Sequence, residues 1–531
     1  MLTKYIKKIK LYFYLIFGNK DSKTFQKFLS GKWKYSNNNS SKGIILLDFF
    51  HHYPFIYFWS YLTNILSKQN KLQVKYFYFP LYNNITSKSS LLKRNLRSIY
   101  RSFNVEKGLD ERDFIIQKNT KLEVQKLFSR INSKEDLIRF KYKGIHIGDL
   151  IYDSYLRSFF KCTVSLDDKK LLELFLRAIN NFKQIENYLD KNKVKFIIPS
   201  HIQYFQYAML VRIACKKNIS VLKLHSSDWG NSKFRLQKIN RNFPSEMAKD
   251  FTQFRKIFRN LKNKQQKFKL GNKIINQRMS GNFDKSLSYM KKSSYLKKNN
   301  YNNNLFSTLK NKQIVAVFCH CFFDAPHKYR SMIFPDFYEQ INFLIKLSKK
   351  YSEFTWIFKR HPNELPENDK EYKNIFKNKN NVYFIKDELN NADLLKLNLK
   401  LAITDHGTVA HEMANFNIPV INTGDNPQIK YNFNFHAKNK VNLSNIIYNI
   451  LIKKKKLKIN KKDLYEFLYM NYFYYNNLFN EETYQLDKCL ATSDKKFNES
   501  SKILNFYVKN KNFADKKISN YIKSFIKINK I

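Results

Sequence analysis

The sequence predicts an α/β protein in which two domains each contain a doubly wound parallel sheet. Short apolar runs alternate with helical patterns in two separate parts of the chain, residues 43–258 and 313–440. Between these parts, residues 259–312 carry few apolar runs and many Lys, Asn and Ser, which indicates an interdomain linker. The chain has 531 residues and is 43% hydrophobic, so both domains can form sizeable cores.

The first domain begins with a clear strand, GIILLDF at 43–49, and continues with a helix and a second strand at 72–79. Residues 89–190 are predicted to be a mostly helical insertion. The α/β alternation returns with strands at 194–201 and 220–230. We therefore expect one sheet interrupted in sequence by helices.

The second domain contains a regular series of strands, each followed by a polar loop or a helical pattern. These strands are expected at 313–319, 354–359, 382–385, 401–404 and 420–421. Successive βα repeats imply a parallel sheet with right-handed crossovers. Residues 441–531 are basic and aromatic, and they are expected to form a helical C-terminal extension.

Polar side chains follow the predicted strands of both domains at the point where each strand ends. Because the carboxyl ends of parallel strands meet at one edge, we expect the polar edges of the two sheets to face a central cleft. An interpretation in which the histidines only cap strand ends stays open. The residues are Asp48, His51, His201, His225 and Asp228 in the first domain and His320, Asp324, Arg360, His361, Asp405 and Thr408 in the second.

The stretch 401–422 predicts a strand, a sharp turn, a helix and a second strand in close succession. Gly407 and Thr408 begin the helix, where free backbone N–H groups and the helix dipole favour an anion such as a phosphate. The alternative is that Thr408 only caps the helix.

The formal net charge is +55, from 97 Lys plus Arg against 42 Asp plus Glu. The basic residues are spread through nearly every segment, which favours compositional drift over nucleic-acid binding, so no nucleic-acid partner is expected. The basic N-terminal segment, residues 1–42, suits a peripheral position on an anionic membrane surface. Its apolar run at 11–17 is too short to span a bilayer, and no other run is long enough. Five irregularly spaced cysteines favour a reduced, cytosolic compartment.

Three ordered motifs in the second domain resemble the GT-B glycosyltransferases of bacterial capsule and surface polysaccharide biosynthesis. They are HCFFDAPHKYRSMIFPDFYEQ at 320–340, FKRHPNE at 358–364 and TDHGTVAHEMANFNIPVINTGDNP at 404–427. The segment TDHGTVAHE is also similar to UDP-N-acetylglucosamine 2-epimerases and, more distantly, to CDP-glycerol glycerophosphotransferases. The resemblance implies two Rossmann-like domains and a nucleotide-sugar site.

The resemblance also implies roles for the polar residues of the second domain. Gly407 and Thr408 would bind the donor phosphates, and Glu412 would accept hydrogen bonds from the ribose. His361, flanked by Arg360, would stabilise the leaving nucleotide. The remaining expected donor-binding residues are His320, Asp324, Arg330 and Asp405.

The acceptor hydroxyl must lose a proton to a general base, and the resemblance implies that this base comes from the first domain. The candidates are Asp48, His51, His225 and Asp228, with Asp149 and Asp153 of the polar segment 143–157 as weaker alternatives. No metal and no cofactor is expected, since GT-B enzymes generally need no bound metal and the nucleotide sugar is a substrate.

The sequence therefore predicts a cytoplasmic glycosyltransferase at the inner face of the cell membrane. It would transfer a sugar from a nucleotide-sugar donor to a glycan or lipid-linked glycan acceptor of the capsule or lipopolysaccharide type. A sugar-nucleotide 2-epimerase or a CDP-polyol phosphotransferase is the alternative within the same fold. A nucleic-acid or anionic-surface binding protein is the alternative from another class.

Overall fold

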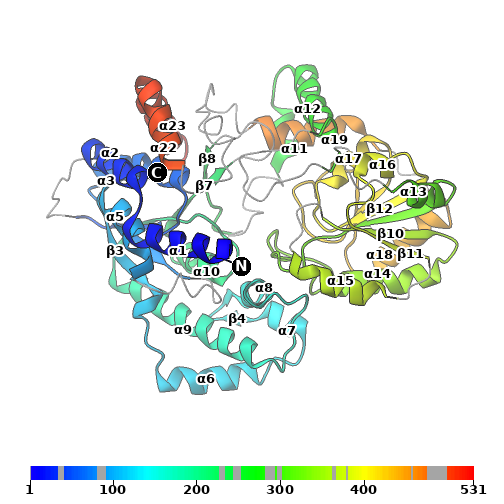
Figure 1. The fold of residues 1–531 in the computed structure, drawn as a ribbon, viewed down its shortest axis with the longest axis horizontal. Coiled ribbons are helices and arrows are strands. Elements are labelled where there is room, and N and C mark those ends of the chain that lie inside the picture. Colours follow the sequence, from blue (N-terminus) through cyan, green and yellow to red (C-terminus); the bar gives the residue numbers. More distant parts are fainter. Residues whose placement is uncertain are drawn as a thin grey trace.

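The computed structural model describes residues 2–33, 41–80, 91–226, 234–242, 253–281, 294–295, 302–361, 366–377, 381–455, 459–474 and 499–531. Figure 1 shows two lobes, one holding β3, β7 and β8 and the other β10, β11 and β12. Each lobe contains a six-stranded sheet.

The first sheet has the strand order β3-β2-β1-β6-β7-β8. Its strands are parallel except β8, which runs antiparallel to β7. All five residues of β1 are buried, because helices cover both faces of the sheet. The strands are β1 (Ile44–Asp48), β2 (Gln73–Tyr78), β3 (Val105–Asp110), β6 (Val194–Ile198), β7 (Ser220–Ser226) and β8 (Phe234–Lys238).

The second sheet has the order β11-β10-β9-β12-β13-β14, and all its strands are parallel. When the strands are numbered within each six-stranded sheet, both sheets have the order 3-2-1-4-5-6, which is that of a Rossmann sheet. The predicted class, α/β with two Rossmann-like domains, is confirmed. The strands are β9 (Ile314–Phe318), β10 (Thr355–Lys359), β11 (Val382–Ile385), β12 (Leu399–Thr404), β13 (Val420–Asn422) and β14 (Phe435–His436).

The first sheet separates two hydrophobic cores. Ile45 and Leu47 face the core formed with α3, whereas Leu46 faces the core formed with α8, α9 and α10. The strand β3 lies within the region predicted to be helical, and its sequence VEKGLD has apolar residues only at Val105 and Leu109. The elements around the sheet are α3 (Tyr53–Asn70), α5 (Arg94–Arg101), α6 (Lys118–Phe128), α7 (Lys134–Arg139), a hairpin of β4 (Lys141–Tyr142) and β5 (Ile145–His146), α8 (Gly148–Phe159), α9 (Lys169–Lys191) and α10 (Phe205–Lys216).

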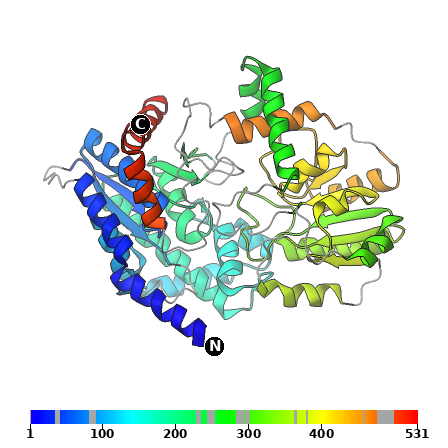
Figure 2. The same ribbon diagram turned by 45° about the horizontal axis from the view of Figure 1, so that its top comes forward.

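Helices from both ends of the sequence pack together on α3. Phe25 of α2 (Lys20–Lys32) and Ile522 of α23 (Lys511–Ile528) are fully buried in one core, and α22 (Glu499–Lys509) lies beside them. Figure 2 shows these first helices in blue next to the last ones in red. The segment predicted as a C-terminal extension is therefore divided, because its last two helices belong to the first domain.

The helix α1 (Leu2–Phe17) packs against α5 and exposes a row of apolar side chains. Ile6, Ile9, Phe13 and Phe17 are spaced for one helical face and are 43%, 54%, 61% and 55% exposed. Among the described residues, no helix is long and apolar enough to cross a membrane.

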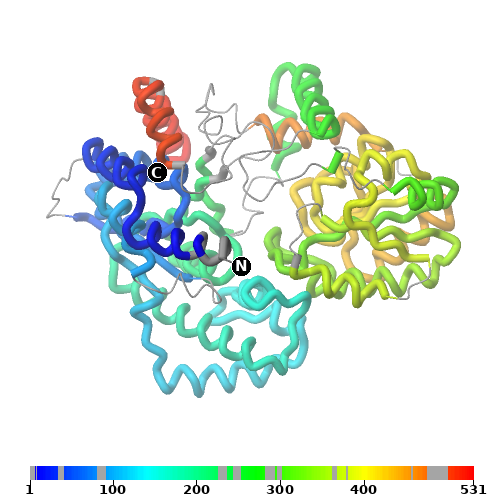
Figure 3. The backbone as a smooth tube through the Cα atoms, in the orientation of Figure 1, coloured from blue at the N-terminus to red at the C-terminus, as the bar shows by residue number. Residues whose placement is uncertain are grey.

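The predicted linker also contains helices that pack with the second domain. The helix α12 (Lys264–Met279) contacts α19 (Lys461–Tyr469) and α17 (Val409–Asn415), and Figure 3 traces α12 and α19 together at the edge of that lobe. The other helices of this domain are α11 (Phe254–Arg259), α13 (Asn303–Lys310), α14 (Phe337–Lys350), α15 (Asp369–Phe376), α16 (Asn391–Leu394) and α18 (Lys440–Leu451).

Candidate functional site

The polar edge of the second sheet lies at its topological switch point, between β9 and β12. His320 follows β9, and Asp405 and His406 follow β12. The rings of His320 and His406 lie 4.4 Å apart between centroids, and Nδ1 of His406 donates to the Asp405 carboxylate over 2.5 Å. His320 Nε2 lies 3.2 Å from the Thr404 hydroxyl oxygen. Open α/β sheets bind their ligands at this place.

Burial controls the protonation of this cluster. It lowers the pKa of His320 and the pKa of His406 well below the usual value, so both imidazoles are neutral near pH 7. Burial raises the pKa of Asp405 to about 6, against the hydrogen bond that the Thr423 hydroxyl donates to it. Because Nδ1 of His406 donates to Asp405, the Nε2 atom of that ring is the hydrogen-bond acceptor.

The turn between β12 and α17 depends on glycine. A Cβ atom on Gly407 would lie 2.6 Å from the Thr404 hydroxyl oxygen and 3.6 Å from the His320 ring. The Thr408 side chain makes no capping hydrogen bond, so simple capping of α17 does not explain this residue. Instead, the guanidinium of Arg278, from α12, donates to the Thr408 hydroxyl. A positive charge thus lies beside the turn where phosphates were predicted to bind.

Glu412 has protein partners at both carboxylate oxygens. Oε1 accepts a hydrogen bond from Nε of Arg278, and Oε2 accepts one from the Tyr295 hydroxyl over 2.6 Å and one from the Asn391 amide over 3.2 Å. The residue is fully buried. The resemblance implied that Glu412 binds ribose hydroxyls, and in the structure its carboxylate holds Arg278 beside the Gly407–Thr408 turn.

Arg360 and His361 follow β10, the neighbouring strand. The guanidinium of Arg360 binds Asp369 over 2.6 Å and lies 3.5 Å from a carboxylate oxygen of Asp387, so its charge is directed at acidic residues of its own domain. His361 is exposed. The residues of the second motif that follow it, 362–364, lie outside the described part of the chain.

Asp324 and Arg330 belong to the loop after β9. Nζ of Lys328 lies 3.9 Å from the Asp324 carboxylate. Arg330 has a φ of 109°, which is rare for a residue with a side chain, and it lines a cavity whose other lining residues come from the first domain. Within the described ranges, no group of three His, Cys, Asp or Glu could hold a metal ion.

The first sheet carries a hydrogen-bonded chain at its own switch point, between β1 and β6. Asp48 ends β1, and one of its carboxylate oxygens accepts hydrogen bonds from the Ser200 backbone N–H over 2.9 Å and from the Ser200 hydroxyl. The Ser200 oxygen lies 2.8 Å from Nδ1 of His201. Burial raises the pKa of Asp48 to about 6, against the bonds from Ser200 that favour the charged form.

Asp48 belongs to this series of hydrogen bonds, and His51, another predicted base, does not lie in it. Because the Ser200 hydroxyl donates to Asp48, the His201 Nδ1–H donates to Ser200 and leaves Nε2 of the ring as an acceptor. His51 instead lies against α1, with its Nε2 3.4 Å from the Tyr14 hydroxyl. His225 lies in β7, and its side chain and the whole of Asp228 fall outside the described residues.

The loops that follow β6 and β9, each beside one switch point, interact with each other. Tyr204, in the first of these loops, has its pKa raised well above the usual value by burial and then by the negative charge of Asp324 in the second. Its φ of 61° is uncommon for an aromatic residue, and strained backbone of this kind concentrates at functional sites. The charge of Asp324 acting on Tyr204 indicates that the two loops bordering the polar edges lie close to each other.

The helix α8 joins the two domains through polar contacts. Asp153 accepts hydrogen bonds from Nδ1 of His327 over 2.6 Å and from its backbone N–H over 3.2 Å. Asp336 of the second domain accepts a hydrogen bond from the Tyr152 hydroxyl. Asp149 forms a two-point ion pair with Arg212, over 2.6 and 2.7 Å. The two weaker base candidates thus have structural partners.

Several of these residues had only a partial signal in the sequence. His201 was visible as a polar residue that ends a predicted strand, but its link to Asp48 through Ser200 was not. Arg278 comes from the region predicted as a linker, and no pattern around it indicates a site. Tyr295 was missed for the same reason, and Asn391, which begins the short helix α16 of the second domain, was missed because no pattern around it indicates a site.

Comparison with known proteins identifies distant structural similarity alone. No sequence-family profile matches the chain, and no curated protein sequence matches it. The UDP-GlcNAc 2-epimerase of Neisseria meningitidis, solved with UDP-GlcNAc bound, is similar over 80% of this chain and 96% of its own, at 12% identity and a TM-score of 0.27. The beta Kdo 2,4 transferase KpsC of Thermosulfurimonas dismutans is similar over 52% of this chain and 79% of its own, at 11% identity and a TM-score of 0.34.

A third similar structure is the UDP-GlcNAc 2-epimerase of Methanocaldococcus jannaschii in complex with UDP-GlcNAc and UDP. It matches 80% of this chain and 97% of its own, at 14% identity and a TM-score of 0.24. These structures include both a transferase and epimerases. Such distant likenesses carry no residue roles across to this chain.

Proposed function

We propose that this chain is a glycosyltransferase that moves a sugar from a nucleotide-sugar donor to a hydroxyl of a surface glycan. The observation that carries the proposal is a titratable cluster at each of two switch points, whose bordering loops interact through Tyr204 and Asp324. One edge carries the chain from Asp48 to His201, and the other carries His320, Asp405 and His406. Perturbed carboxyl and imidazole groups gathered at such edges are typical of active sites.

The donor belongs at the second edge. Arg278 and the Gly407–Thr408 turn offer a charged donor and backbone N–H groups to the diphosphate. The neutral imidazole of His320 adds a hydrogen-bonding group without the desolvation cost of a buried charge. When the bond from the sugar to the diphosphate breaks, the negative charge that develops on the leaving phosphate is stabilised by these groups.

The acceptor belongs at the first edge. Its hydroxyl oxygen forms the new bond to the sugar, and its proton passes to Nε2 of His201. The imidazolium that results is stabilised through Ser200 by the carboxylate of Asp48, which is ionised above a pKa of about 6. Asp48 is therefore a positioning and charge-stabilising residue in this proposal, and His201 is the base.

The donor site can be tested with one glycine substitution and a matched control. We expect a panel of UDP-, GDP-, CDP- and CMP-sugars to contain at least one that raises the thermal unfolding midpoint, because ligand binding stabilises the native state. Gly407→Ala should weaken that binding by about tenfold or more, since the new Cβ displaces the Thr404 and His320 pair. Gly31→Ala is the control, because a Cβ there meets nothing within 4 Å. Equal affinity in both variants would rule out the donor site.

Product analysis separates the enzyme classes that share the fold. A glycosyltransferase releases nucleotide in step with the added acceptor, whereas a 2-epimerase changes the labelled sugar without any acceptor. A CDP-polyol phosphotransferase would release CMP and transfer the phosphate with the polyol. Binding that tracks nucleic-acid length and falls steeply with salt would point instead to a nucleic-acid-binding protein.

The exposed apolar row of α1 supports a position of the enzyme on an anionic membrane surface. Ile6, Ile9, Phe13 and Phe17 face outward in a helix whose sequence also contains four lysines, Lys4, Lys7, Lys8 and Lys10. Sedimentation with phosphatidylglycerol vesicles tests this part of the proposal. Unchanged sedimentation of a Phe13→Ser and Phe17→Ser double variant would count against it.

A further inference from the structure

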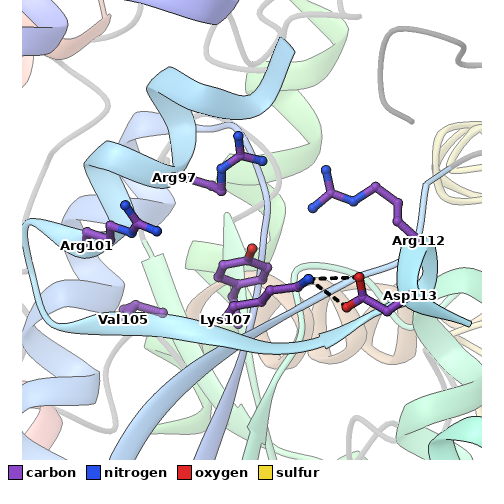
Figure 4. A pocket seen from close by; sticks show the side chains of 7 residues that line it. Arg97, Arg101, Val105, Lys107, Arg112 and Asp113 are labelled. Carbon is purple, nitrogen blue, oxygen red and sulfur yellow. Dashed lines mark hydrogen bonds and ion pairs between the residues drawn. The ribbon is translucent and has the colours of Figure 1, made fainter. Parts of the chain in front are cut away.

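A basic cavity lies at the outer edge of the first sheet, away from both switch points. It has a volume of about 290 Å³ and is lined by side chains of α5, β2, β3 and the turn that follows β3. Figure 4 shows the guanidinium groups of Arg97, Arg101 and Arg112 around one space, with Lys107 below them directed at Asp113. The complete lining is Tyr76, Arg97, Arg101, Val105, Lys107, Arg112 and Asp113.

The positive charge of this cavity is only partly neutralised. Nζ of Lys107 lies 2.7 Å from a carboxylate oxygen of Asp113, and Arg112 is paired with Asp110. Within the described part of the chain, neither Arg97 nor Arg101 forms an ion pair with a carboxylate. Burial, and after it the charges of Arg112 and Arg101, lower the pKa of Arg97, against the opposing effect of Tyr76. The cations therefore repel one another and would be stabilised by an anion.

Two buried hydrogen-bond donors of the cavity have no partner among the described residues. The Tyr76 hydroxyl is one, on a side chain that is only 3% exposed, and Nη1 of Arg112 is the other. Buried polar groups are almost always satisfied, and an orphan in a cavity indicates a missing ligand, ion or water. A phenol hydroxyl and several guanidinium donors around one space suit a ligand with many acceptor oxygens.

We propose that this cavity binds the phosphate group of a phosphomonoester. A phosphate offers acceptors for the forked guanidinium groups and for Tyr76 at the same time, which a chloride or a single carboxylate cannot do. The volume is at the lower end of small-molecule sites, so it fits a phosphate with a small substituent and not a whole nucleotide sugar. The site is separate from the proposed donor site, which lies in the other domain, and it does not depend on that proposal.

Calorimetric titration with inorganic phosphate and with glycerol 3-phosphate, at constant ionic strength, tests the site. Wild-type protein should bind both, and the Arg97→Ala and Arg101→Ala double variant should bind at least about tenfold more weakly. Tyr76→Phe keeps the ring and removes the hydroxyl, so it should weaken binding by about threefold to tenfold. Arg130→Ala removes an exposed arginine of the same domain and should change nothing.

The result that overturns the proposal is phosphate affinity that is the same in the double variant, in Tyr76→Phe and in wild type. Absence of phosphate binding to wild-type protein would overturn it equally. Gly407→Ala distinguishes this site from the proposed donor site, because phosphate binding to the cavity must survive that substitution. A binding loss in Gly407→Ala alone would place the phosphate in the other domain and refute the cavity.

Two sources could supply the phosphomonoester, a soluble metabolite or a lipid headgroup. Sedimentation with vesicles of phosphatidic acid in phosphatidylcholine separates them. Vesicle binding that depends on Arg97 and Arg101 identifies the lipid headgroup. Vesicle binding that ignores these arginines, together with their effect on soluble glycerol 3-phosphate, identifies the soluble ester.

Discussion

Asp48 illustrates how much of the site a single residue reveals. Its position after an apolar run was predictable, because buried parallel strands end at the ligand-binding edge of the sheet. Its partner Ser200 lies 152 residues away in the sequence. That contact requires the pairing of β1 with β6, and no local pattern in either strand specifies its neighbour. The candidate residue could therefore be predicted, whereas its hydrogen-bonded chain could not.

The raised pKa of Asp48 predicts a pH dependence of stability. Its folded value of about 6 lies above the usual 3.8, so the native state binds this proton more tightly than the unfolded chain does. The resulting stabilisation is complete below about pH 4 and is lost as pH rises through 6, by about 3 kcal/mol in all. The side chain introduced by Asp48→Asn stays neutral. In urea unfolding, the free energy of unfolding of this variant should therefore increase relative to that of wild type between these pH values. Asp167→Asn, an exposed aspartate, should show no such gain.

The same titration should appear in catalysis. Transferase activity should rise as pH increases through about 6, because the ionised carboxylate stabilises a protonated His201. Asp48→Asn should reduce kcat by about 100-fold and remove this limb of the pH profile, as measured by nucleotide release. A variant with normal activity and an unchanged profile would separate Asp48 from the reaction.

Among the helices, α23 shows that an amphipathic pattern does not identify the surface against which a helix packs. The spacing of Ile518, Ile522 and Phe525 indicates that one face is buried, but not which domain covers it. The structure places this face on α3, where the carboxylate of Asp515 accepts a hydrogen bond from the Tyr61 hydroxyl over 2.6 Å. The strands with continuous apolar runs, such as β1 and β9, were predictable because helices cover both faces. β3 was not, since an edge strand needs fewer apolar residues.

Two isoleucines of α23 provide a matched test of this packing. Ile522→Ala should destabilise the protein by about 2–5 kcal/mol, because it leaves a cavity in the core between α23 and α3. Ile528→Ala is the control, since Ile528 is 62% exposed and its loss should cost little. Urea unfolding followed by circular dichroism measures both. Equal midpoints would mean that α23 does not pack on the first domain in solution.

At the scale of the whole molecule, the relative position of the domains depends on a small polar interface. The Asp153 and His327 pair is buried between α8 and the loop after β9, with both side chains at most 4% exposed. Sequence analysis predicted that the two polar edges face each other, and the loops carrying Tyr204 and Asp324 agree with this. It could not predict the pair itself, because Asp153 and His327 are 174 residues apart and each lies among other polar residues.

Removal of one member of this pair should loosen the two domains. His327→Ala leaves the Asp153 carboxylate buried without its partner, which should cost about 3 kcal/mol or be relieved by separation of the domains. Small-angle X-ray scattering should then give a larger radius of gyration than for wild type. The double variant Asp153→Asn with His327→Ala should recover part of the loss, because it leaves no unpaired charge. Additive losses in the double variant would show that the pair does not couple the domains.

The packing of α22 and α23 on the first domain determines the order in which the two domains can complete their folding during synthesis. All strands of that domain's sheet have been synthesised once β8 has left the ribosome. Its core also needs Ile518, Ile522 and Phe525, which are synthesised nearly three hundred residues later. The second domain, with β9 to β14 between residues 314 and 436, can close first. The domain that is translated first is thus the last to be finished, and until then the apolar surface of its α3 is exposed and prone to aggregation.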